Sequence, residues 1–163
     1  QPGWDKEKGM QTRVTTDQGK TQASQDFLKK LLTLTAAGGA SFWISDFVIA
    51  VSPISSAYQA AFSIASLPVA LVEALAGGLV IAGCVSFVLL RFFDRIPGKN
   101  SIHKALILCF STMAIIEVLS AIGNPAHAFV YLVLDTGMNI PRFLVLGWTI
   151  GFVFDKQNRK VLR

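Results

Sequence analysis

The sequence predicts an all-α polytopic membrane protein, with four transmembrane helices packed as a bundle and both termini in the cytoplasm. The 163-residue chain is 52% hydrophobic and only 15% charged, whereas soluble domains average about a quarter charged residues. Apart from four acids and one Arg, every charged residue falls within 1–30, 91–104 or 155–163. The remaining sequence forms apolar blocks of about twenty residues or more, the length that crosses hydrocarbon.

The blocks define the domain organisation. Residues 1–23 are polar and lack periodicity, so we expect a disordered cytoplasmic tail. A transmembrane domain covers 24–155, and its four spans are predicted at about 31–52, 68–92, 103–122 and 127–154. Residues 156–163 form a basic cytoplasmic tail. Because a polar segment precedes the first long block, we expect an uncleaved signal anchor; Met10 is a candidate start residue.

Small residues mark the helix faces that should pack. In the second predicted span, one stripe holds Ala70, Glu73, Gly77 and Cys84, and another holds Ala74, Gly78 and Ala82. Small residues let helices approach closely, so both faces are expected to contact other helices.

The connections are short. Residues 54–67 carry no formal charge, which fits an interfacial helix or an extension of the second span. Pro97 and Gly98 should end one helix, and Asn100 or Ser101 should cap the next. Residues 123–125 predict a tight outer turn.

The distribution of Lys and Arg predicts the orientation. The two connections assigned outside contain neither residue, while the segments assigned inside contain all of them except Arg142. The protein is therefore expected in a plasma or inner membrane as a multi-pass protein. We interpret the net charge of +5 as an indication that the cytoplasmic face contacts anionic lipid head groups, and not that the protein binds nucleic acid.

Each span carries one acid: Asp46, Glu73, Glu117 and Asp135. At about 1.5 Å per residue, all four lie in the outer half of the membrane, with Arg142 about 22 Å down from the outer end. Ionisable residues at such depths are rare and usually functional or paired. These acids, with Asn139 and Arg142, are the candidate ligand-binding residues.

The fourth span concentrates these polar residues. Asp135, Asn139 and Arg142 are spaced i, i+4, i+7, which places them on one helix face. Pro141 interrupts the same region, so a helix broken between Gly137 and Pro141 is an alternative to a continuous one.

Two interpretations of the polar residues stay open. In the first, which the sequence favours, the acids line an outward-facing cavity of a small transporter-like protein that binds a cation, proton or small solute. In the second, they hold helices together in a non-catalytic structural or assembly subunit of a larger membrane complex. Either could involve a homo-oligomer. A membrane enzyme ranks third, because the sequence has no catalytic motif, metal-ligand pattern or cofactor motif.

The two cysteines, Cys84 and Cys109, both lie inside apolar blocks. Pairing between them is open, but small packing thiols are the favoured interpretation.

Overall fold

The computed structural model describes residues 4–53, 67–123 and 128–161, and it is all-helical within them. The helices are α1 (Trp4–Ala50), α3 (Leu67–Phe92), α4 (Ser101–Gly123) and α5 (Ala128–Val161), with a 3₁₀ turn η1 (Phe93–Arg95) after α3. Four segments are long and apolar enough to cross a membrane: Thr21–Ala50, Pro68–Arg95, Ser101–Gly123 and Asp135–Arg159. The predicted number of spanning helices is confirmed at this level of length and composition.

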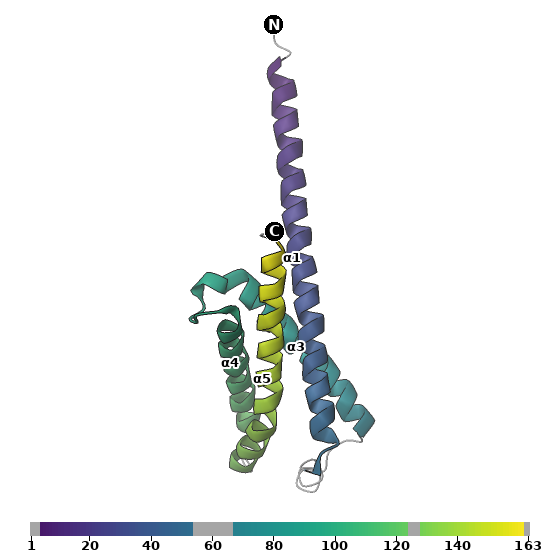
Figure 1. Cartoon of the computed structure of the whole chain (residues 1–163), viewed down its shortest axis with the longest axis vertical. Coiled ribbons are helices and arrows are strands. Elements are labelled where there is room, and N and C mark those ends of the chain that lie inside the picture. The colour runs from purple at the N-terminus through teal and green to yellow at the C-terminus, as the bar shows by residue number, and fades with distance from the viewer. Residues whose placement is uncertain (1–3, 54–66, 124–127, 162–163) are drawn as a thin grey trace.

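Helix α1 extends further than the sequence predicted. Residues 4–23, expected to be a disordered tail, continue α1 as helix and project alone beyond the other helices (Figure 1). Helix propagation from an existing helical segment adds one hydrogen bond per residue without a new nucleation step. The apolar part of α1 therefore supplies the nucleus on which this polar segment continues.

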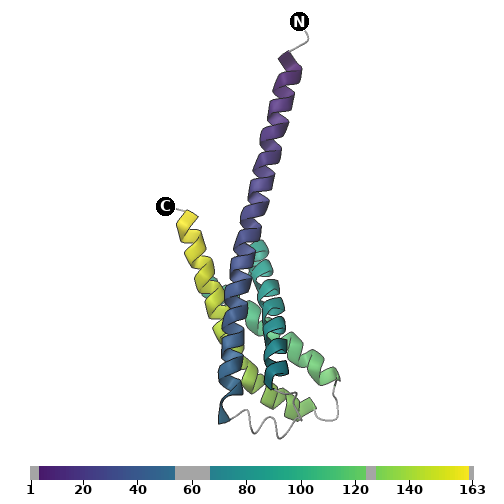
Figure 2. The same ribbon diagram turned by 90° about the vertical axis from the view of Figure 1, so that its right-hand side faces the viewer.

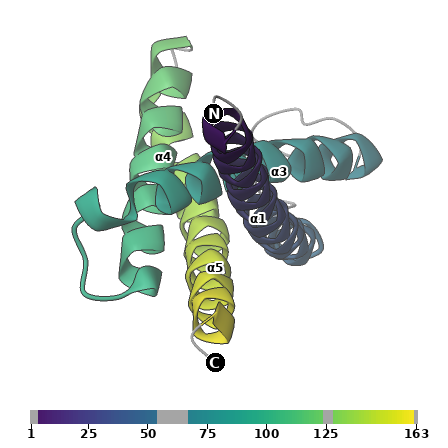
Figure 3. The same cartoon turned by 90° about the horizontal axis from the view of Figure 1, so that it is seen from above.

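Helix α5 is the most buried of the four. In the most apolar stretch of α5, 39% of the residues are buried, against 22% in the corresponding stretch of each of the other three helices. It packs most extensively on α4 and also on α1, whereas α3 packs mainly on α1. Figure 3 shows α3 crossing the others at a steep angle, with α4 and α5 on one side of α1.

The fourth span is one continuous helix, so the alternative broken between Gly137 and Pro141 is wrong. Helix α5 runs through Pro141 without interruption. Figure 2 shows that its first, green turns point in a different direction from its later, yellow turns. A proline inside a helix removes one hydrogen bond and bends the axis, which accounts for a bend without a break.

The connection between α3 and α4 has the predicted signals. The Asn100 side chain accepts a hydrogen bond from the backbone N–H of His103 at 2.9 Å, which caps α4. Gly98 has a φ of 146°, a conformation that favours glycine. Lys104 Nζ donates to the Phe93 carbonyl at 2.7 Å and lies 3.9 Å from the Phe93 ring centroid. The predicted connections at 54–67 and 123–125 lie almost wholly outside the described residues.

Arg91, Lys104 and Lys156 lie near the ends of α3, α4 and α5, and Lys30 lies where the apolar part of α1 begins. The side of the bundle that carries these four residues is called here the basic end. The apolar core lies between this end and the middle of the helices. Its largest buried side chains include Leu34, Leu89, Phe143, Leu146 and Ile150. The core positions the helices so that the polar residues of α1, α4 and α5 face one another.

Candidate functional site

Buried stripes on three helices each lead to a polar residue. On α1 the stripe of Leu34, Gly38 and Phe42 continues to Asp46, and on α4 the stripe of Ala105, Cys109 and Met113 continues to Glu117. On α5 the stripe that contains Phe143, Leu146, Ile150 and Phe154 begins at Asn139. The spacing of three or four residues keeps each polar residue on the same face as its apolar neighbours.

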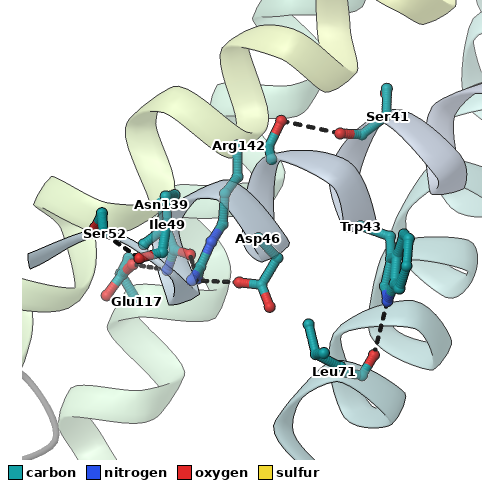
Figure 4. A network of polar contacts seen from close by, with 10 residues as sticks. Ser41, Trp43, Asp46, Ile49, Ser52, Leu71, Glu117, Asn139 and Arg142 are labelled. Carbon is teal, nitrogen blue, oxygen red and sulfur yellow. Dashed lines mark hydrogen bonds and ion pairs between the residues drawn. The ribbon is translucent and has the colours of Figure 1, made fainter. Parts of the chain in front are cut away.

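These residues and Arg142 form a hydrogen-bonded series, which is called here the polar chain. Arg142 Nη2 forms an ion pair with Asp46 Oδ1, and Arg142 Nη1 donates to Asn139 Oδ1 at 2.9 Å. Asn139 Nδ2 then donates to Glu117 Oε1 at 2.8 Å. Figure 4 shows the Arg142 side chain reaching between Asp46 on α1 and the Asn139–Glu117 pair. The polar chain therefore joins α1, α5 and α4 at one level.

The geometry defines the role of each group. The amide oxygen of Asn139 accepts a hydrogen bond from the Arg142 cation, and its amide nitrogen donates one to the Glu117 carboxylate. Only one orientation of the amide satisfies both partners. The side chains of Arg142 and Asp46 are only 16% and 11% exposed. Arg142 Nε is buried and makes no hydrogen bond within the part of the chain that the structure describes. The ion pair is thus largely removed from solvent, where Coulombic attraction is strong and the loss of one partner is costly.

The polar chain carries an excess of acid. Asp135, four residues before Asn139 and partly buried, interacts electrostatically with Glu117. Three carboxyl groups thus lie in the region of one guanidinium group. Among the described residues, no three His, Cys, Asp or Glu side chains gather closely enough to hold a metal ion.

The structure brings together five of the six predicted residues and leaves Glu73 apart. Asp46, Glu117, Asn139 and Arg142 are in the polar chain, and Asp135 is near Glu117. Glu73, by contrast, is exposed on α3. The buried stripe of α3 contains Gly78, Ala82, Val85 and Leu89, and Glu73 lies on the opposite side of the helix from this stripe.

An open, mostly apolar surface pocket of about 300 Å³ lies along α5, away from the polar chain. It is lined by Val145, Trp148, Thr149 and Phe152. None of the candidate acids contributes to its wall.

Close packing through glycine was not predicted for α5. Gly147 and Gly151 face α4, and a methyl group added to Gly151 would lie 2.5 Å from Ile102 Cα. Their spacing, Gly-x-x-x-Gly, is a recognised helix-packing signal and could have identified this contact.

A second unpredicted contact joins α1 to α3. Trp43 Nε1 donates to the Leu71 carbonyl at 3.1 Å, and Figure 4 shows this contact set apart from the ion pair of Arg142 with Asp46. An indole N–H in an apolar segment needs an acceptor, but nothing in the sequence indicates which one.

Comparison with known proteins identifies no relative. No protein-family model, no curated protein and no solved structure matches this chain. The geometry of the polar chain is therefore the basis for the functional proposal.

Proposed function

We propose that this chain is a four-span integral membrane protein of a plasma or inner membrane, with both termini in the cytoplasm. Its proposed role is that of a non-catalytic structural or assembly subunit of a larger membrane complex. The basic end would face the cytoplasm and contact anionic lipid head groups, because Lys and Arg accumulate in cytoplasmic flanks.

The polar chain is the observation that carries this proposal. Asp46, Arg142, Asn139 and Glu117 hydrogen-bond to one another across three helices and are largely buried. Interhelical hydrogen bonds and ion pairs of this kind hold transmembrane helices in one arrangement. A ligand would have to displace these contacts in order to bind the same groups, which favours a structural role over a binding role.

The large exposed apolar surface supports a role within a complex. Side chains with more than half of their surface exposed occur on all four helices; examples are Val48, Val80, Leu119 and Trp148. Lipid can cover such surfaces, but so can helices of other subunits. The polar chain would keep these surfaces in a defined relative position.

Isolation from the native host tests the proposal. The tagged chain, extracted in a mild detergent, should run well above its own 17.6 kDa together with stoichiometric partner polypeptides. Deletion of its gene should lower the amount of those polypeptides in the membrane. A chain that purifies alone, and whose deletion leaves every other membrane polypeptide at its normal level, would contradict the proposal.

A transporter-like protein that binds a cation, proton or small solute is the second candidate. The excess of acids around Arg142, including the interaction of Glu117 with Asp135, favours it. In proteoliposomes, this candidate predicts solute or proton flux that is lost in Asp135→Asn. Flux that is absent, or is equal in wild type and Asp135→Asn, would leave the structural role as the better explanation.

A further inference from the structure

Helix α3 has two faces with different surroundings. One face packs on α1, where Gly78 lies against Phe42 and Gly39 lies against Leu79. The opposite face includes Glu73, Gly77, Val80 and Cys84, and all four residues are exposed. It ends before Phe87, whose ring packs edge-on against Phe27 of α1. This opposite face is called here the open face of α3. The sequence predicted that both faces would contact helices, and within the described residues only the first does so.

The orientation of the open face is fixed by contacts on the other side of α3. The hydrogen bond from Trp43 to the Leu71 carbonyl holds this end of α3 against α1. The close approaches at Gly39 and Gly78 hold the following two turns. A rotation of α3 that buried Glu73 against α1 would break all of these contacts.

Glu73 is an acid in an apolar segment. It lies eighteen residues from Arg91 at the basic end, about 27 Å along the helix axis at ~1.5 Å per residue. It is five residues from Pro68, where the apolar segment begins. An ionisable side chain inside a span normally finds a partner, because hydrocarbon offers none.

The apolar segments of this chain have no free Lys or Arg to offer Glu73. There is no Lys or Arg from residue 31 to residue 90, and from 105 to 155 Arg142 is the only one. Arg142 is already in the ion pair with Asp46. A second copy of the chain has the same composition, so it also lacks an uncommitted Lys or Arg at this level. A Lys or Arg partner for Glu73 must therefore come from a different polypeptide.

The open face also has room for a helix. Among the described residues, a methyl group added to Gly77 would meet nothing within 4 Å, so none of them covers the backbone one turn from Glu73. Backbone exposed at glycine allows a second helix to approach closely, and such an approach brings side chains one turn away into contact.

We propose that the open face of α3 binds a transmembrane helix of a different protein, which places a Lys or Arg against Glu73 and packs across Gly77. The inference rests on the proposed role as a subunit and names the surface and the chemistry of the partner. Charge complementarity at Glu73 selects the partner helix, and the glycine permits its close approach.

The test uses the full-length chain in its native host and follows the size of the extracted complex. Glu73→Lys should reduce the fraction of chain in the complex at least tenfold through repulsion, and Gly77→Leu should do so by blocking close approach. Gly137→Leu is the matched control, because Gly137 on α5 is also exposed and has none of the described residues within 4 Å of an added methyl group. This control should leave the complex intact.

The native cysteines give a second readout. Cys84 lies on the open face, whereas Cys109 is buried. A membrane-permeant maleimide should label Cys84 at least tenfold faster in Glu73→Lys than in the wild-type complex, with Cys109 unlabelled in both. A compensating substitution gives a third readout. If a Lys or Arg of the partner helix contacts Glu73, replacing that residue by Glu should restore complex formation with the Glu73→Lys variant.

Three outcomes would overturn the inference. A complex of normal size in both open-face variants would show that partners bind elsewhere, while the proposed subunit role would survive. Oxidative Cys84–Cys84 crosslinking between two copies would assign the open face to a homodimer. Equal labelling of Cys84 in wild type and Glu73→Lys would show that no helix covers this face. Absence of any complex in the wild type would instead refute the subunit role itself.

Discussion

Removing the Arg142 guanidinium group should strongly destabilise the packing of α1, α4 and α5, because Arg142 contacts both Asp46 and Asn139. Arg142→Met keeps much of the side-chain length but removes the cation. Asp46, with a side chain only 11% exposed, then loses its ion-pair partner, and Asn139 Oδ1 loses its donor. Breaking a buried ion pair by removing one partner typically costs about 3–5 kcal/mol in the free energy of unfolding, and we expect a loss in this range.

Removing both charges should cost much less than removing one. Asp46→Leu alone leaves the Arg142 cation without its carboxylate, and we expect a second loss of about 3–5 kcal/mol. The double variant Asp46→Leu/Arg142→Met contains no unpaired charge at this contact. Replacing a buried pair by apolar residues is often neutral or stabilising, so the double variant should unfold within about 1–2 kcal/mol of wild type after the loss at Asn139 is included.

Reversible unfolding in mixed detergent micelles, with increasing SDS, measures these free energies. Loss of helix is followed by circular dichroism, and the four proteins form a double-mutant cycle. The expected coupling between the two sites exceeds about 3 kcal/mol, since independent sites add to within about 0.5 kcal/mol. If the two single losses simply add in the double variant, the ion pair does not hold these helices together and the reasoning is wrong.

Three further changes test packing and the basic end. Gly151→Ala places a methyl group 2.5 Å from the α4 backbone and should cost roughly 1–3 kcal/mol in the same unfolding assay. The matched Gly77→Ala, in open space, should be neutral or gain up to about 1 kcal/mol, so equal stability of the two would contradict the packing of α4 on α5. Trp43→Phe removes the hydrogen bond to the Leu71 carbonyl and should cost about 0.5–1.5 kcal/mol, whereas an unchanged unfolding curve would show that this bond does not hold α3. Lys104→Met removes the contacts that hold η1; protease cleavage within residues 93–100 should become faster, and an unchanged rate would refute that role.

Much of the site could be predicted because helical periodicity is visible in the sequence. Asp135, Asn139 and Arg142 share a face by spacing alone, and Asn139 lies on that face in the structure. Asp46 and Glu117 were candidates because an acid in an apolar span needs a partner. The ion pair of Asp46 with Arg142 was one option among several, since each of the four acids could have met the only Arg.

Glu73 shows where this reasoning stops. Its spacing with Gly77 and Cys84 is as regular as that of Gly78 with Ala82, so the sequence offers two packing faces on one helix. The structure uses the face of Gly78, where Phe42 of α1 fits against the glycine. Which face packs depends on the shapes of two helices together, and the periodicity of one helix does not contain that information.

By itself, the sequence determined the helical class, the number of apolar spanning segments and the identity of the four residues in the polar chain. Composition and a 3.6-residue period are local properties of the chain, so they can be read without a partner helix. Only the tertiary structure decided that Arg142 pairs with Asp46, that Asn139 bridges to Glu117, that α5 stays continuous through Pro141, and that Glu73 faces outward. Each of these depends on how separate helices cross and on which small residues let their backbones meet, as Gly78 does at Phe42 and Gly151 at Ile102.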